Sequence, residues 1–273
     1  MDLTILGSAA AEGWPALFCS CDACTQALAL GGKDLRRRTS YRLGDHVQID
    51  WGPDTYGACL AFGMDTSALT DLVVTHSHED HFTPRELWYR RNGFSQVPEE
   101  RTLTVHGSTQ VEEALRTELA DDAEFNVRFS LLRPFAETAL PGGLSVTPIP
   151  AAHAEAIGGA LNFIFHLNGR HLLIGNDTGW WDTEVWGFLA ETPLDVAVMD
   201  CTYGNREERR GHLGAPDVAA AKQELLSLGA LTEDCRFIAN HFSHNGGWLH
   251  AELETYFAPH GIEVGYDGMT VEW

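Results

Sequence analysis

The sequence lacks the features that would place the protein in a membrane or on a nucleic acid. No apolar run approaches the roughly 18–20 residues that a transmembrane helix needs, and the segment Met1–Gly7 has no basic stretch, so we expect neither a signal peptide nor a membrane partner, and a cytoplasmic protein. Basic residues are few, with 18 Lys and Arg against 39 Asp and Glu, which gives a net charge of −21. This acidity argues against a nucleic-acid partner. A small phosphate substrate stays open, because bound metal ions reverse the local field.

Short apolar strands alternate with helical patterns over the 273 residues, and no repeat or linker interrupts them. This pattern predicts an α/β fold in which residues 1–273 form a single domain. Asn168-Gly169 between two apolar runs predicts a hairpin. Strands are predicted at Leu3–Gly7, Val47–Trp51, Leu72–Thr75, Leu103–His106, Leu144–Pro148, Leu161–Leu167, His171–Gly175, Val196–Cys201, Phe237–His241 and Ile262–Gly265. Helices are predicted at Pro84–Arg91, Thr109–Ala120, Thr183–Glu191, Pro216–Leu228 and Leu249–Phe257.

The richest chemical signal is the hexapeptide His76-Ser77-His78-Glu79-Asp80-His81, an H-x-H-x-D-H motif. It follows a predicted buried strand, so the side chains of one short loop converge at the C-terminal end of that strand, where active sites of α/β proteins are common. Imidazole and carboxylate together bind divalent metals such as zinc, manganese or iron. The alternative is a surface histidine cluster with no ligand role.

Three further candidate ligands, His153, Asp177 and His241, each follow an apolar stretch later in the chain. In this order after H-x-H-x-D-H, the pattern resembles the metallo-β-lactamase superfamily of binuclear metallohydrolases. The resemblance implies an αββα sandwich, with two mixed sheets flanked by helices and the metals at one edge between the sheets. It also implies two divalent metals bridged by Asp177, one taking His76, His78 and His153 and the other Asp80, His81 and His241.

The six cysteines divide into a compact motif and three scattered residues. Cys59, Cys201 and Cys235 are expected to be buried thiols. Cys19-Ser20-Cys21-Asp22-Ala23-Cys24 forms C-x-C-x-x-C, which in a chain without an export signal favours metal binding over disulfides. This N-terminal motif resembles the PhnP-type phosphodiesterases of phosphonate catabolism. There, three such cysteines and a later histidine, here His244, hold a structural zinc; the alternative for His244 is an ordinary surface or core histidine.

The resemblance implies a binuclear metal-dependent phosphoric diester hydrolase. Its substrate would be a small cyclic phosphodiester, 5-phosphoribosyl 1,2-cyclic phosphate or a relative, attacked in line by a metal-bound hydroxide. Asp80 and His212 are the candidate catalytic residues, His212 as proton donor or phosphate ligand in the Gly211–Gly214 loop. Arg36 and Arg38 are candidate phosphate ligands, since guanidinium groups bind phosphate bidentately. Solvent-exposed roles remain the alternative for His212 and both arginines. Manganese or zinc is expected in the catalytic pair, with iron or nickel as alternatives, and a homodimer is left open.

Three other readings compete. Proteins of the PqqB type, which act in quinone-cofactor biosynthesis without hydrolysis, resemble the same cysteine pattern, but the intact H-x-H-x-D-H motif argues against that role. A thioesterase or a tRNA 3′-end nuclease of the same superfamily is the second reading, and net acidity disfavours the nuclease. An oxygen-reducing di-iron protein is disfavoured because such proteins prefer a carboxylate at the position of His78.

Overall fold

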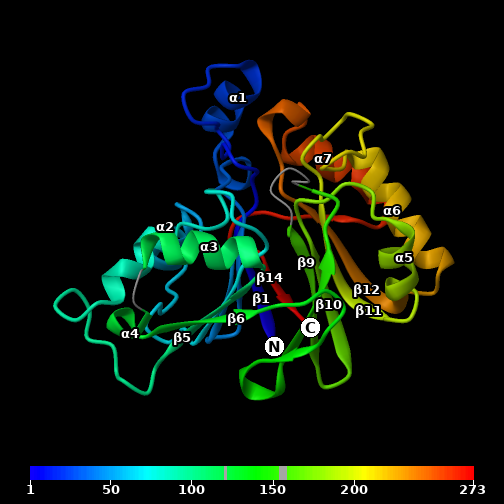
Figure 1. The fold of residues 1–273 in the computed structure, drawn as a ribbon. Coiled ribbons are helices and arrows are strands. Elements are labelled where there is room, and N and C mark those ends of the chain that lie inside the picture. The colour runs from blue at the N-terminus through cyan, green and yellow to red at the C-terminus, as the bar shows by residue number, and fades with distance from the viewer. Residues whose placement is uncertain (120–121, 154–158) are drawn as a thin grey trace.

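The computed structural model describes residues 1–119, 122–153 and 159–273. Its strands form two seven-stranded sheets, which face each other across a shared core (Figure 1). The first sheet has the order β14-β1-β2-β3-β4-β5-β6. Its strands are β1 (Asp2–Gly7), β2 (Ser40–Leu43), β3 (Val47–Ile49), β4 (Asp71–Val73), β5 (Leu103–Gly107), β6 (Val127–Leu131) and β14 (Thr270–Glu272).

The second sheet has the order β13-β12-β11-β10-β9-β8-β7. Its strands are β7 (Thr138–Ala139), β8 (Ser145–Pro150), β9 (Leu161–Leu167), β10 (Arg170–Gly175), β11 (Leu194–Asp200), β12 (Leu231–Asn240) and β13 (Glu263–Val264). In both sheets a parallel half adjoins an antiparallel half, so both are mixed. Consecutive parallel strands end at the same sheet edge, and polar residues that follow them are brought together there.

Helices cover the outer face of each sheet. The 3-10 helix Pro84–Arg90 and α3 pack on the first sheet, and α5, α6 and α7 pack on the second (Figure 1). The α-helices are α1 (Asp22–Leu30), α2 (Thr55–Ala61), α3 (Thr109–Glu118), α4 (Asp122–Phe125), α5 (Thr183–Leu189), α6 (Ala215–Ser227) and α7 (His250–Phe257). The remaining 3-10 helices are Gly32–Asp34, Pro141–Gly143, His244–Gly246 and Ala258–His260. The architecture is the αββα sandwich expected from the sequence.

The predicted elements recur with shifted ends, and several others were missed. The hairpin is confirmed, because Asn168 and Gly169, both at positive φ, connect β9 to its antiparallel partner β10. The segment after Thr83 forms a 3-10 helix where an α-helix was a natural expectation, and the end predicted at Ala120 for the next helix lies outside the described residues. The strands β2, β6, β7 and β14 and the helices α1, α2 and α4 were not predicted.

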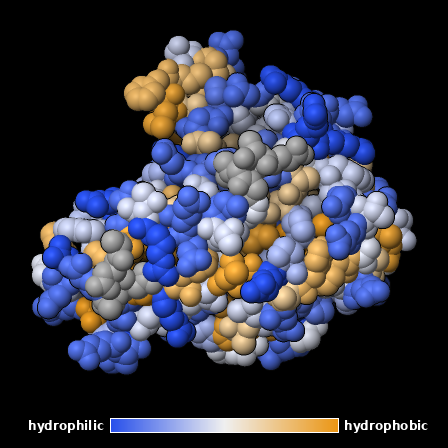
Figure 2. Space-filling view, viewed as in Figure 1, coloured by the Kyte–Doolittle hydropathy of each residue, from blue (hydrophilic) through white to orange (hydrophobic). Residues whose placement is uncertain are grey.

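The segment around α1 stands away from the two sheets at one end of the molecule (Figure 1). Figure 2 shows apolar residues gathered on this projecting unit, among them the exposed side chains Leu17, Phe18, Leu28 and Leu30. Searched over the described residues, the chain contains no helix that is both long and apolar enough to cross a membrane.

Candidate metal centres

The H-x-H-x-D-H loop begins just after β4 and is held in place by hydrogen bonds to Asp50. This buried carboxylate follows β3 and accepts hydrogen bonds from the backbone and the hydroxyl of Thr75. Its second oxygen accepts a 2.7 Å bond from Nδ1 of His81, which is itself fully buried. This bond fixes the ring so that Nε2 of His81 faces the other ligand candidates. Asp50 was not predicted as a site residue, although its place directly after an apolar strand is the same signal that marked Asp177.

The three histidines assigned to the first metal lie together. His76, His78 and His153 each offer a nitrogen within 4.8 Å of the others. Nδ1 of His153 donates to the carbonyl of Gly211 at 2.9 Å, which leaves its Nε2 as the inward-facing atom. Burial, together with the charge of His81, lowers the pKa of His76 well below its ordinary value, and burial also lowers the pKa of His153. Both rings are therefore neutral, as metal ligation requires.

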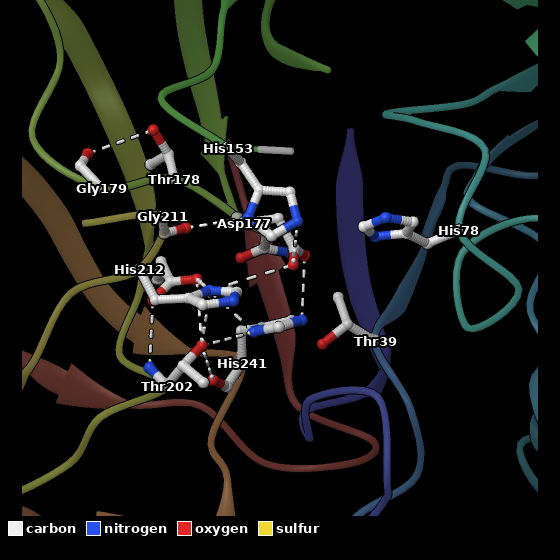
Figure 3. A network of polar contacts seen from close by, with 12 residues as sticks. Thr39, His78, His153, Asp177, Thr178, Gly179, Thr202, Gly211, His212 and His241 are labelled. Atoms are coloured by element: carbon white, nitrogen blue, oxygen red, sulfur yellow. Dashed lines mark hydrogen bonds and ion pairs between the residues drawn. The ribbon is translucent and has the colours of Figure 1, made fainter. Parts of the chain in front are cut away.

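Asp177, after β10, lies between this group and the ligands assigned to the second metal (Figure 3). Its Oδ2 is 3.0 Å from Nε2 of His81 and 2.9 Å from Nε2 of His241, and its Oδ1 is 3.7 Å from Nε2 of His153. Burial disfavours the carboxylate, but the charges of His241 and His81 outweigh it and hold the pKa of Asp177 well below its ordinary value.

The second group consists of Asp80, His81 and His241, again within 4.8 Å of one another. His241 follows β12, and its Nδ1 lies 2.8 Å from the hydroxyl of Thr202. Asp50, Asp177 and His241 all have positive φ values of 58°, 47° and 61°. Non-glycine residues avoid this region unless the surroundings enforce it, and such conformations are concentrated at functional sites. The seven residues His76, His78, Asp80, His81, His153, Asp177 and His241 are called the His/Asp centre below.

The donor atoms of the His/Asp centre fit the binding of divalent metal. Four of its buried atoms make no hydrogen bond within the described part of the chain: Nε2 of His81, His153 and His241, and Oδ2 of Asp177. Oδ2 of Asp177 lies 3.0 Å from Nε2 of His81 and 2.9 Å from Nε2 of His241, but neither contact has hydrogen-bond geometry. Buried polar atoms are rarely left without partners. Here the atoms converge on shared points, as metal ligands do.

His212 lies beside this centre, as the sequence predicted, but with a partner that the sequence did not identify. Its Nδ1 is 2.9 Å from Oδ2 of Asp200, a fully buried carboxylate, and its ring stacks on that of His241 with centroids 5.7 Å apart. Burial disfavours the imidazolium, yet the charge of Asp200 and this hydrogen bond raise the pKa of His212 to about 9. The pair resembles the arrangement in which a carboxylate orients a histidine for proton transfer.

A second cluster, called the Cys/His centre below, ties the projecting unit to the body. The thiols of Cys19, Cys21 and Cys24 and Nδ1 of His244 lie within 4.8 Å of one another. All six cysteines of the chain are free thiols, and of the three scattered ones Cys59 and Cys201 are buried while Cys235 is half-buried. A backbone hydrogen bond at Cys24, reinforced by His244, lowers the pKa of Cys21 to about 6. Three sulfurs and one nitrogen are the donor set of a closed tetrahedral zinc site.

Glu12 supports this centre from outside and was not predicted. Its Oε1 is 3.5 Å from Nε2 of His244 and also accepts a hydrogen bond from Ser243. A histidine that ligates through one nitrogen and faces a carboxylate with the other is the usual arrangement at zinc sites. A glutamate seven residues before the first cysteine gives no local sequence signal for this role.

The prediction that Arg36 holds substrate phosphate is wrong. Its side chain is buried, and its two terminal nitrogens bond to Ser8, to the carbonyl of Gly265 and to His250, inside the protein. Arg38 is half-buried, with Nε 3.3 Å from Asp54; its phosphate-binding role stays a prediction.

Residues 47–231 match the family model described as the beta-lactamase superfamily domain, which covers more than half of the chain. The chain belongs to this superfamily. Its membership accounts for the αββα fold and for the clustering of histidines and aspartates at one edge, where superfamily members bind divalent metals. No curated protein matches the sequence.

Solved structures with the same fold differ widely in sequence. A diphosphatase from the PhnP family is 20% identical, with a TM-score of 0.77 over 100% of this chain and 96% of that one. Zinc-bound PqqB from Methylobacterium extorquens is 17% identical, with a TM-score of 0.74 over the full length of both. The short form of human tRNase Z is 16% identical, with a TM-score of 0.68 over 100% and 99%. At these identities the likeness establishes the fold alone.

Proposed function

We propose that the protein is a metal-dependent phosphodiesterase that hydrolyses a small cyclic phosphodiester, such as 5-phosphoribosyl 1,2-cyclic phosphate. The convergence of the unpartnered atoms of His81, His153, Asp177 and His241 carries the proposal. The His/Asp centre would hold two metals, with zinc or manganese the best matches to its donors. When bound, the metals would activate water and neutralise charge on the phosphate. The Cys/His centre would hold one zinc with a structural role.

The protein's own groups perform the remaining steps. His76, His78 and His153 would hold one metal, and Asp80, His81 and His241 would hold the other. Asp200 keeps the His212 ring oriented, so that Nε2 points away from the carboxylate and can give a proton to the leaving alkoxide. An alkoxide is a poor leaving group unless it is protonated, so a positioned proton donor matters most for alkyl esters.

Metal analysis combined with a substrate panel tests the proposal. The purified protein is expected to contain three metals per chain and to hydrolyse bis(p-nitrophenyl) phosphate and cyclic ribose phosphates. Thioesters and precursor tRNA belong in the same panel, because turnover confined to either would assign one of the competing superfamily activities. A fully metal-loaded protein that turns over none of these substrates would favour the non-hydrolytic role.

The variant His212→Ala tests the proton donor. Metal content is expected to stay constant while kcat for alkyl phosphodiesters falls by roughly 10²–10⁴-fold. The loss for p-nitrophenyl esters is expected to be much smaller, because p-nitrophenolate leaves without a proton. Equal losses for both ester classes would make His212 a phosphate ligand, and no loss for either would remove it from the reaction.

A further inference from the structure

The His/Asp centre is assembled from both sheets. His76, His78, Asp80 and His81 lie on the loop after β4 of the first sheet. His153, Asp177 and His241 follow β8, β10 and β12 of the second sheet. A pair of metals about 3.5–4 Å apart tolerates errors of only about 0.5 Å in ligand placement. The position of one sheet relative to the other is therefore part of the site.

A polar contact inside the apolar core joins the two sheets next to this centre. Tyr41, in β2 of the first sheet, is fully buried among the residues that both sheets contribute to the core. The side-chain amides of Asn176 and Asn240 both hydrogen-bond to its hydroxyl, Asn240 at 2.8 Å. Both asparagines are fully buried and belong to the second sheet, at the ends of β10 and β12. Burial raises the pKa of Tyr41, so the hydroxyl keeps its proton.

The two asparagines immediately precede two metal-ligand candidates. Asn176 is followed by Asp177 and Asn240 by His241, and both of these following residues have positive φ. Such a conformation is strained in a residue other than glycine and persists only where neighbouring contacts enforce it. The amide of each asparagine, held by Tyr41, anchors the residue just before the turn. The carbonyl of Asn176 also accepts a hydrogen bond of 2.6 Å from Asn162, which in turn accepts one from Trp181.

The donor and acceptor count shows how the contact is completed. Both amides present Nδ2 to the hydroxyl, while their Oδ1 atoms have no hydrogen-bond partner among the described residues. Turning one amide by 180° about its side chain lets Tyr41 donate to one Oδ1 and accept from the other Nδ2. In that arrangement the hydroxyl bridges the two strand ends with its proton and a lone pair both used.

We propose that Tyr41 is a positioning residue, whose hydroxyl fixes Asp177 and His241 of the second sheet against the H-x-H-x-D-H loop of the first. The inference rests on the proposed function of the His/Asp centre. Its effect is on the geometry of the ligands, so it acts on the affinity of that centre for metal. The Cys/His centre takes three of its four candidate ligands, Cys19, Cys21 and Cys24, from the N-terminal segment and only His244 from the segment after β12, so it serves as a reference in the same molecule.

The test compares Tyr41→Phe with a matched control, Tyr266→Phe, which removes a hydroxyl from a ring packed against the same core. Zinc affinity of the His/Asp centre is measured by chelator competition, and amide hydrogen exchange is followed in the metal-free protein. Tyr41→Phe is expected to weaken zinc binding at the His/Asp centre by roughly 10–100-fold, the usual range for a lost supporting contact. Exchange at Asp177 and His241 is expected to accelerate tenfold or more. The metal of the Cys/His centre and the whole Tyr266→Phe variant stay as in the wild type.

A second variant keeps the test valid if Tyr41→Phe fails to fold. Asn240→Ala retains the bond between Tyr41 and Asn176, so exchange is expected to accelerate at His241 but not at Asp177. Unchanged zinc affinity and exchange in Tyr41→Phe would overturn the proposal. So would equal losses in Tyr266→Phe, or a lower melting temperature without any change at the His/Asp centre. If the wild type binds no metal at that centre, the proposed function fails, while exchange in the metal-free protein still decides the role of Tyr41.

Discussion

The His/Asp centre and the Cys/His centre occupy opposite kinds of environment. The first lies at the seam between two sheets, where His76, His81, Asp177 and His241 are each at most 4% exposed. The second lies at the base of the projecting unit, where Cys21 is exposed and only His244 comes from the body of the protein. The first centre is positioned by the folded strands around it, whereas the second joins three cysteines of the projecting unit to one histidine of the body.

This difference separates two uses of a metal. At the His/Asp centre the fold positions the ligands in advance: Asp50 holds His81, Thr202 holds His241, and the carbonyl of Gly211 holds His153. Rigid ligands favour a defined geometry for reaction. At the Cys/His centre three of the four candidate ligands lie close in sequence on a loop and a short helix, so metal binding there would supply folding free energy locally. Loss of metal from the His/Asp centre should therefore reduce activity, whereas loss of metal from the Cys/His centre should reduce local order.

The largest effect on turnover is expected from Asp80→Ala. Losing one ligand of the second metal removes several kcal/mol of charge stabilisation, roughly a 10³-fold or greater fall in kcat. The fold should persist, because Asp80 lies outside the apolar cores. Metal analysis, circular dichroism and phosphodiesterase assays measure this together, with Glu79→Ala, the neighbouring residue in the loop, as control. Near wild-type turnover with one catalytic metal missing would contradict a two-metal reaction.

A smaller effect is expected from Asp50→Asn, which touches no metal. The amide keeps the size of the carboxylate but removes its charge and one of its two acceptor oxygens, so the backbone of Thr75 and Nδ1 of His81 can no longer both donate to it. Affinity at the His/Asp centre should fall by roughly 10–100-fold, so turnover should recover at high metal concentration. A titration of activity against metal measures this recovery. Turnover that stays low at saturating metal would show that Asp50 acts on the reaction itself.

The sequence predicted which residues come together in both centres, because most of them follow a recognisable local pattern. The H-x-H-x-D-H motif is a single loop, and His153, Asp177 and His241 each follow an apolar strand. The supporting residues were missed because their partners are distant in the chain. Asp50 meets His81 only after β3 pairs with β4, and Asp200 meets His212 across a loop.

The errors in fold and site have the same origin. The strand β2 was missed because it contains Arg42, a residue rarely buried, whose charge is accommodated by the carbonyl of Asp65. Arg36 was read as a surface residue of a basic run. It is buried because Ser8, Gly265 and His250, far apart in sequence, supply its acceptors. Local patterns predict which residues are chemically capable, but tertiary contacts decide which groups they meet.

The variant Cys21→Ser tests the Cys/His centre, as Asp80→Ala tests the His/Asp centre. This exposed thiol can be replaced with little cost in packing, and the Cys/His centre should lose its metal. Turnover is expected to change little, because the seven residues of the His/Asp centre all lie outside the projecting unit. Limited proteolysis of the variant should show new cleavage sites between residues 17 and 30. The control is Cys235→Ser, which changes a half-buried thiol outside both centres. A loss of turnover as large as that of Asp80→Ala would mean that the two centres are not independent.

The smallest effect is expected from Glu12→Gln. Gln retains an oxygen that can accept from Ser243 and face His244, but it lacks the charge that makes the His244 ring a stronger ligand. Affinity at the Cys/His centre should fall by about tenfold, at the low end of the range for supporting residues, with turnover and the His/Asp centre unchanged. Competition with a chromophoric chelator measures this change, and Glu191→Gln, an exposed residue after α5, is the control. Complete loss of the metal, as in Cys21→Ser, would make Glu12 a ligand in its own right. An unchanged affinity would show that the three thiolates alone determine binding, and that the carboxylate near His244 is only a surface contact.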